Sequence, residues 1–187
     1  MNPILLDIPT ELYTDRLYIR IPRPGDGKAV FDAVQASIHE LKEWLPFVHE
    51  ELSEEKCELN LREARAKFYT REDMRLLLFL RDSGQLIGSS GLHNPNWNVP
   101  KFEIGYWLDS RYRGNGYMTE AVNGIAEFAF SELKANRVVI RCDTLNHKSR
   151  AIPERLGFVL EGTLRNDDRS ADSLRLRDTH VYAKIKV

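Results

Sequence analysis

The spacing of apolar residues divides the first third of the chain into one strand and two helices. Leu17 to Ile21 alternates between apolar and polar positions and is followed by Pro22-Arg23-Pro24-Gly25, which predicts a strand and a turn. A helix is then predicted by apolar residues at helical spacing, namely Val30, Val34, Ile38 and Leu41. A second helix is expected to begin at Ser53, with a stripe formed by Cys57, Leu61, Ala64 and Phe68.

Three apolar runs follow in the middle of the chain. Met74 to Leu80 and Leu86 to Leu92 are separated by Asp82-Ser83-Gly84, a turn sequence that predicts a hairpin. Residues 93–100 are rich in Asn and Pro and are expected to form a loop, after which 102–108 form a third strand.

The remaining pattern completes an α/β protein. Val122, Ile125, Ala126, Ala129 and Leu133 predict an amphipathic helix. A strand over 137–142, a short helix ending before Gly157, and strands over 158–164 and 174–187 follow. The order β-α-α-β-β-β-α-β-α-β-β predicts a mixed sheet with helices on its faces. If the strands at Glu103 and Cys142 share that sheet, the helix between them makes a parallel crossover.

Composition narrows the class of protein. A chain of 187 residues is about one domain long, so residues 1–187 are expected to form a single domain. The net charge of −1 gives no reason to expect binding to nucleic acid. Two cysteines and five scattered histidines show no metal-ligand spacing, and no apolar run has the length of a membrane span. We therefore expect a cytoplasmic protein without a metal site.

The turn Arg111-Tyr112-Arg113-Gly114-Asn115-Gly116 lies between a predicted strand and a predicted helix. Free N–H groups and the dipole of a helix N-terminus, close backbone approach at glycine, and arginine side chains together suit a pyrophosphate. A Rossmann fingerprint needs glycine where Thr119 stands, and a P-loop needs Lys and Ser or Thr where Tyr117 and Met118 stand. The alternative is an ordinary glycine turn without a ligand.

The turn and its flanks resemble the acetyl-CoA motif of the GNAT superfamily of N-acetyltransferases. Glu103-Ile-Gly-Tyr-Trp-Leu, followed by Arg111-x-x-Gly114-x-Gly116-Tyr-Met-Thr-Glu-Ala, is similar to the ribosomal-protein N-terminal acetyltransferase branch. Asn146-x-x-Ser149, the later Gly157-Phe158 and the opening Thr14-Asp15-Arg16-Leu17 resemble the same branch. The resemblance covers about residues 14–187 and implies a mostly antiparallel sheet of about seven strands with about four helices, splayed between two parallel central strands.

The resemblance also implies where acetyl-CoA binds. The backbone of Tyr106, Trp107 and Leu108 is expected to hold the pantetheine arm between the splayed strands. The turn is expected to hold the pyrophosphate through Arg111, Arg113, Gly114, Asn115, Gly116, Tyr117 and Met118. Asn146 matches a position that contacts the pantetheine end, although Asn is also a good helix N-cap without any ligand.

Candidate catalytic residues follow from the chemistry of an amine attacking a thioester. Many GNAT proteins place a tyrosine that acts as the general acid where this chain has Pro153. Ser149 therefore becomes the candidate hydroxyl that relays a proton to the leaving thiolate. Alternatively, Ser149 only accepts hydrogen bonds from the free backbone N–H groups at the start of the helix. Strand alternation puts Glu103 on one face with Gly105 and Trp107, which makes Glu103 the leading candidate base. Glu103 is otherwise a solvated carboxylate; Asp168 or a bound water are alternative bases.

The acceptor stays open at this level. The resemblance implies transfer from acetyl-CoA to a primary amine, either a protein N-terminus such as that of a ribosomal protein or a small molecule such as an antibiotic, polyamine or amino-acid derivative. A non-catalytic acyl-CoA-binding domain is the alternative from another class. His93, which opens the predicted loop after a strand, is more simply a packed residue but is a candidate for lining the acceptor site. Family resemblance also suggests a homodimer.

Overall fold

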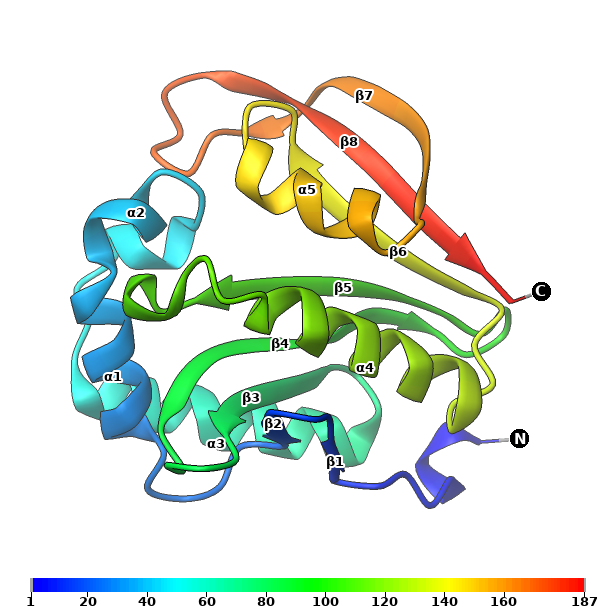
Figure 1. Cartoon of the computed structure of the whole chain (residues 1–187), viewed down its shortest axis with the longest axis horizontal. Coiled ribbons are helices and arrows are strands. Elements are labelled where there is room, and N and C mark those ends of the chain that lie inside the picture. Colours follow the sequence, from blue (N-terminus) through cyan, green and yellow to red (C-terminus); the bar gives the residue numbers. More distant parts are fainter. Residues whose placement is uncertain (1, 187) are drawn as a thin grey trace.

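The computed structural model describes residues 2–186, which contain one eight-stranded mixed sheet (Figure 1). Met1 and Val187, both included in the predicted domain, lie outside the described residues, as does the end of the predicted last strand at Val187. The strands follow the order β1-β2-β3-β4-β5-β6-β8-β7 across the sheet. Their bounds are β1 Glu11–Tyr13, β2 Leu17–Arg20, β3 Met74–Leu80, β4 Leu86–Asn96, β5 Lys101–Leu108, β6 Arg137–Asp143, β7 Val159–Arg169 and β8 Leu176–Ile185.

Helices cover both faces of this sheet. On one face lie α4 (Tyr117–Ser131), against β4 and β5, and α5 (His147–Arg155), against β6 and β8 (Figure 1). The other face carries α1 (Gly27–Ala36) and α3 (Glu54–Thr70), with α2 (Ile38–Lys42) beside them. The apolar stripe of α4 is buried because its small and branched side chains recur every three or four residues: Met118, Ala121, Val122, Ile125, Ala126 and Ala129.

The single parallel pair among the described strands is β5 with β6, and it is short. Lys101, Phe102 and Glu103 pair with Arg137, Val138 and Val139, and no ladder continues beyond them. The two strands then separate, as Figure 1 shows. We call the region between 104–108 of β5 and 140–143 of β6 the wedge, and the pair Glu103–Val139 its apex.

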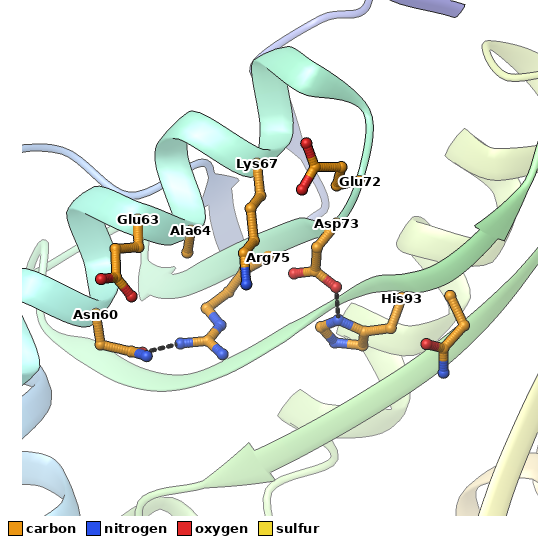
Figure 2. Close-up of a pocket in the computed structure, with 9 residues that line it drawn as sticks. Asn60, Glu63, Ala64, Lys67, Glu72, Asp73, Arg75 and His93 are labelled. Carbon is orange, nitrogen blue, oxygen red and sulfur yellow. Dashed lines mark hydrogen bonds and ion pairs between the residues drawn. The ribbon is translucent and has the colours of Figure 1, made fainter.

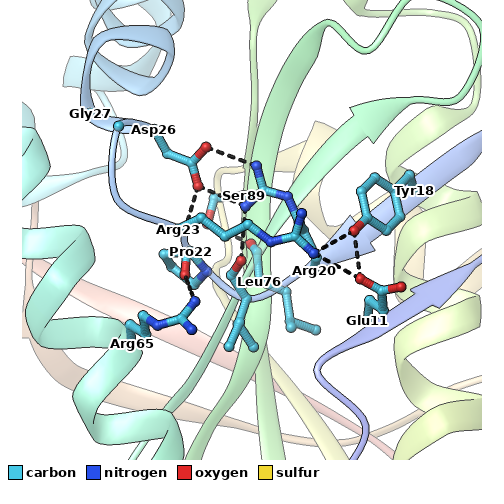
Figure 3. Close-up of polar contacts among 12 residues, drawn as sticks. Glu11, Tyr18, Arg20, Pro22, Arg23, Asp26, Gly27, Arg65, Leu76 and Ser89 are labelled. Carbon is cyan, nitrogen blue, oxygen red and sulfur yellow. Dashed lines mark hydrogen bonds and ion pairs between the residues drawn. The ribbon is translucent and has the colours of Figure 1, made fainter.

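A polar cluster fixes the loop that leads from β2 to α1 (Figure 3). Arg20 donates to both carboxylate oxygens of Asp26, at 2.7 and 2.8 Å, with little of either side chain exposed. Asp26 also accepts from the backbone N–H of Arg23. Removing one partner of such a buried pair typically costs about 3–5 kcal/mol. This cluster sets the direction in which α1 leaves the sheet.

The start of α1 is held by a residue from another helix. Asp26, at the N-cap position, makes no side-chain capping bond. The carboxylate of Glu58 on α3 accepts from the backbone N–H groups of Gly25 and Gly27 instead, at 2.9 Å each. These bonds satisfy donors that a helix start leaves open. A Cβ on Gly27 would lie 2.6 Å from that of Glu58, so this close approach of α1 and α3 needs glycine.

The structure confirms the mixed sheet, its parallel pair and the element order, with three local differences. The helix predicted through Leu41 is broken at Ser37 into α1 and α2. A short edge strand, β1, precedes the first predicted strand. Strand structure also extends further than predicted, through His93–Asn96 in β4 and through Asn166–Arg169 in β7.

Candidate functional site

The glycine turn presents a row of free backbone donors at the open end of the wedge. Gly114 and Gly116 have φ values of +80° and +77°, which L side chains rarely adopt. Arg113 N–H donates to the Ser110 carbonyl, whereas the N–H groups of residues 114–119 have no hydrogen-bond partner in the described part of the chain. The helix α4 begins directly after Gly116. The turn therefore has the donors and the dipole that an anion requires.

Both predicted arginines of the turn are paired with carboxylates. Arg111 bends back onto the fully buried side chain of Asp109, with Nη2 to Oδ2 at 2.5 Å. Burial opposes ionisation of Asp109, but the bonds from the Arg111 side chain and backbone hold its pKa below its ordinary value. Arg113 pairs with Glu40 of α2 at 2.6 Å. Arg111 thus shapes the turn, while Arg113 connects it to α2.

The break between α1 and α2 anchors the start of this turn. The Ser37 hydroxyl, on a fully buried residue, accepts from the backbone N–H of Ser110 at 2.8 Å. It also lies 3.4 Å from Asp109 Oδ1, to which it donates. Ser37 therefore connects the helical layer on one face to the turn that ends β5.

The wedge is bridged by a hydroxyl pair, Tyr106 on β5 and Ser149 on α5. Tyr106 Oη donates to the Ser149 carbonyl at 2.9 Å and accepts from Ser149 Oγ at 3.2 Å. In a regular helix that carbonyl would accept from residue 153, but Pro153 has no N–H. Tyr106 therefore supplies the donor that Pro153 lacks. Burial raises the pKa of Tyr106, so it remains a protonated donor at neutral pH.

Asn146 acts as the N-cap of α5. Its Oδ1 accepts from the backbone N–H of Ser149 at 3.0 Å, as the ligand-free alternative expects. This bond uses one end of the amide, and the Nδ2 end forms no bond to the described residues. The structure thus places Asn146 and Ser149 together at the start of α5, with one amide donor still available.

Glu103 lies at the apex of the wedge, on the face opposite α4. Its neighbours Phe102 and Ile104 are buried in the core beneath α4, which leaves Glu103 pointing to the other side. Its carboxylate accepts from Asn94 Nδ2 at 3.2 Å. Trp107, on the same face, packs against apolar residues of α1 and α2. Strand alternation therefore predicted this arrangement correctly.

Asp168 lies on β7, away from the apex, rather than in a loop. Its carboxylate accepts from Arg177 Nη2 at 2.8 Å and from the backbone N–H of Arg169. The bond from Arg177 holds the pKa of Asp168 below its ordinary value. An ion-paired carboxylate of lowered pKa is a weak proton acceptor.

Comparison with known proteins decides the family. Residues 16–159 match the family described as the acetyltransferase (GNAT) domain. The chain belongs to the GNAT acetyltransferases. It is 32% identical over 153 residues to the putative ribosomal N-acetyltransferase YdaF of Bacillus subtilis, covering 81% of this chain and 82% of that protein. It belongs to the ribosomal-protein N-acetyltransferase branch of the family.

Solved structures agree with this assignment. A probable acetyltransferase of 28% identity superposes with a TM-score of 0.86, covering 94% of this chain and 97% of that one. The ribosomal alpha-N-protein acetyltransferase RimL, in complex with coenzyme A, superposes with a TM-score of 0.85 at 21% identity, covering 95% and 97%. That second likeness shows the shared fold. This chain is therefore a GNAT N-acetyltransferase.

Contacts of the acetyltransferase that sequence reasoning missed join the N-terminal segment to the turn. Glu120, in the first turn of α4, accepts from Thr14 Oγ1 at 2.6 Å and from the backbone and side chain of Arg16. Arg16 also donates to the Asn115 carbonyl at 2.9 Å and stacks over the Tyr117 ring. Because 104 residues separate Arg16 from Glu120, no local sequence pattern indicates the contact. The one signal in the sequence was that Arg16 and Glu120 each lie in a segment that resembles the ribosomal-protein branch.

Residues 2–186 show neither a metal-binding cluster nor a membrane-spanning helix. Within that range no group of three or more His, Cys, Asp or Glu side chains is arranged to hold a metal ion. No helix there is long and apolar enough to span a membrane.

Proposed function

We propose that this acetyltransferase transfers the acetyl group of acetyl-CoA directly to the N-terminal amine of a protein or peptide, such as a ribosomal protein. The wedge, with a glycine turn of free N–H groups at its open end, is the observation that carries the proposal. The similarity to a protein named as a putative ribosomal N-acetyltransferase supports the choice of acceptor.

In this proposal the cofactor lies along β5. The backbone of Tyr106, Trp107 and Leu108 binds the pantetheine arm as an added strand would, because β6 no longer pairs with that stretch. The free N–H groups of residues 114–118 bind the pyrophosphate. The free amide end of Asn146 donates to the pantetheine end. Arg111 and Arg113 contribute by holding the turn in its shape.

Direct attack without an acetyl-enzyme agrees with the state of the two cysteines. Burial raises the pKa of Cys142, on β6 beside the wedge, to about 11, and it also raises that of Cys57. Both are therefore protonated thiols at neutral pH, whereas the nucleophilic form of cysteine is the thiolate. An amine that attacks the thioester carbon itself needs no such intermediate.

The proposed catalytic groups are Glu103 and Ser149, which lie on opposite faces of the sheet. The carboxylate of Glu103 attracts the acceptor amine to the apex. The hydroxyl of Ser149, after turning from Tyr106, donates to the departing sulfur. General acid–base assistance of this kind is typically worth about 10²- to 10⁴-fold.

An α-amine is a favourable acceptor on chemical grounds. Its pKa in peptides is about 8, so a useful fraction is neutral at pH 7, whereas a lysine side chain near 10.4 is almost fully protonated. An enzyme that relies on modest base catalysis therefore gains more from an N-terminal amine.

A screen for release of the CoA thiol tests this proposal. The enzyme is incubated with acetyl-CoA and two acceptor panels: peptides with free N-termini, including ribosomal-protein N-termini, and small amines such as polyamines and aminoglycosides. Each peptide is matched with its N-formylated form, which keeps every side chain. We expect release with free peptides only. Release with small amines alone would contradict the proposed acceptor, and tight CoA binding without release for any amine would contradict transfer.

A further inference from the structure

The imidazole of His93 lies on the sheet surface beside the apex of the wedge. His93 on β4 pairs with Glu103 on β5, and Gly91 pairs with Gly105 two residues further along the ladder. A Cβ on Gly105 would lie 3.3 Å from Cδ2 and 3.6 Å from Nε2 of His93. The ring therefore covers Gly105, two residues beyond the apex, on the same face as Glu103.

Two glycines make room for the ring in this position. A Cβ on Gly91 would lie 2.6 Å from the Met74 carbonyl oxygen and 3.0 Å from Cε1 of His93. The absence of side chains at Gly91 and Gly105 lets the imidazole lie over the two strands. The ring therefore lies on the sheet surface over Gly105, two residues from the apex of the wedge.

Asp73 orients this imidazole from the turn between α3 and β3. His93 Nδ1 lies 2.6 Å from Asp73 Oδ1, and Figure 2 shows the two side chains facing each other. When Nδ1 carries the proton and donates it to the carboxylate, the neutral ring presents the Nε2 lone pair as an acceptor. Nε2 forms no hydrogen bond to any residue in 2–186. An acid–imidazole pair with a free nitrogen is the arrangement of a general base.

Space for an acceptor exists beside this pair. A cavity of about 360 Å³ opens between α3, β3 and β4 and is lined by both His93 and Asp73 (Figure 2). The opposite face of β5 is closed, because Phe102 and Ile104 are buried under α4. The cavity therefore lies on the face of the sheet that carries Glu103 and His93.

We propose that His93, oriented by Asp73, is the general base that removes the proton from the acceptor amine. The proposal rests on the proposed acetyl transfer and names its proton acceptor, with Glu103 attracting the amine. The nitrogen lone pair attacks the thioester carbon, and the proton on that nitrogen moves to His93 Nε2. The C–S bond then breaks, its electron pair goes to sulfur, and the thiolate takes the hydroxyl proton of Ser149, which Ser149 regains from water. The amide and free CoA leave, and His93 returns its proton to water.

Charged side chains from the neighbouring elements surround His93. Asp73 is in direct contact with the ring, and further carboxylates face the same cavity. Two cationic side chains, Lys67 and Arg75, also line this cavity, and Arg75 donates a hydrogen bond to Asn60. The charged and titratable groups that face His93 are Asp73, Glu72, Glu63, Lys67, Arg75 and, from β5, Glu103.

The test compares His93→Gln, His93→Ala and Asp73→Asn with the wild-type enzyme, using a reactive N-terminal peptide. We expect His93→Gln to lower kcat/KM by about 100-fold or more. The decrease of kcat at low pH, which protonation of the base causes, should also disappear in this variant. Asp73→Asn should lower kcat by about 10-fold, because the ring loses its orientation. Added imidazole should restore activity to His93→Ala, which has a space at that position, and not to His93→Gln.

Two controls separate this role from a structural one. His180→Gln removes a half-buried imidazole that is likewise hydrogen-bonded, to Thr163 at 2.8 Å, and should retain wild-type activity. The affinity for acetyl-CoA should be unchanged in all His93 and Asp73 variants. A His93→Gln enzyme with near wild-type kcat, and with the same decrease of kcat at low pH, would overturn the assignment of His93 as the base. The proposed function would not be affected by that result. Inactivity of the wild type with every amine, despite CoA binding, would overturn the proposed function and this inference together.

Discussion

At the scale of single residues, the turn is specified by backbone conformation more than by charge. Gly114 and Gly116 occupy the left-handed region, and both arginines of the motif are bonded to carboxylates of the protein. The sequence correctly indicated the glycines, because few other residues fit such a turn. It did not indicate that Arg111 pairs with Asp109, since a motif lists residue types and not the partners that folding brings to them.

Replacing Gly116 with valine should damage cofactor binding more than stability. A β-branched residue in the left-handed region costs roughly 1–2 kcal/mol, and its side chain would meet Arg16 Nη2, which lies 3.6 Å from the Cβ position. We expect at least a tenfold loss of acetyl-CoA affinity by titration calorimetry. Gly84→Val, in the β3–β4 turn with φ of +68° and open space around it, carries the same strain and should bind normally. Equal affinity for both variants would contradict the role given to Gly116.

At the scale of elements, apolar periodicity predicted the helices and central strands well. It failed where a strand is polar or exposed on both faces, as in β1 and the outer half of β7, because no buried face imposes alternation there. It also failed at Ser37, where a bond to the Ser110 backbone, 73 residues away, accompanies the break between α1 and α2. The sequence pattern predicts a loop from His93 onward, although β4 continues to Asn96. Its pairing with Asp73 depends on that continuation.

The contact between β5 and α5 makes a prediction about Tyr106 and Pro153. Tyr106→Phe should lower the free energy of unfolding by about 1–3 kcal/mol, because the Ser149 carbonyl loses its donor. Pro153→Ala supplies an N–H that can reach the same carbonyl within the helix. The double variant should therefore be more stable than Tyr106→Phe alone.

Denaturant unfolding of the four proteins in this cycle measures the coupling between the two positions. A coupling energy near zero would show that the two positions act independently. That result would contradict the claim that Tyr106 supplies the donor that Pro153 lacks.

At the scale of the whole molecule, carboxylates tie distant segments together and make the fold sensitive to acid. The backbone N–H of Gly25 and the Arg62 side chain hold the pKa of Glu58 below 4.5. Burial raises the pKa of Glu120, but the bonds from Thr14 and Arg16 outweigh it and hold the value below 4.5. These groups stabilise the folded state above their unfolded pKa, and the contribution is lost as the pH falls through the folded pKa.

We therefore expect the thermal unfolding midpoint to decrease as the pH is lowered from about 5 to about 3. Glu120→Gln should have a lower midpoint at neutral pH. Its midpoint should also decrease less as the pH is lowered, because glutamine carries no charge that protonation can remove. Glu55→Gln, at an exposed position in the first turn of α3, is the matched control and should follow the wild type. Identical curves for all three proteins would refute the role of Glu120 in joining 14–16 to α4.

The central claim is that acetyl-CoA binds the folded chain at the wedge and glycine turn, and thermal unfolding with and without acetyl-CoA tests it most directly. At 100 times its Kd the ligand stabilises the folded state by about 2.7 kcal/mol. For a protein of this size that is a rise in midpoint of about 5–11 °C. The account predicts this rise for the wild type and its loss in Gly116→Val. An unchanged wild-type midpoint at millimolar acetyl-CoA would contradict it.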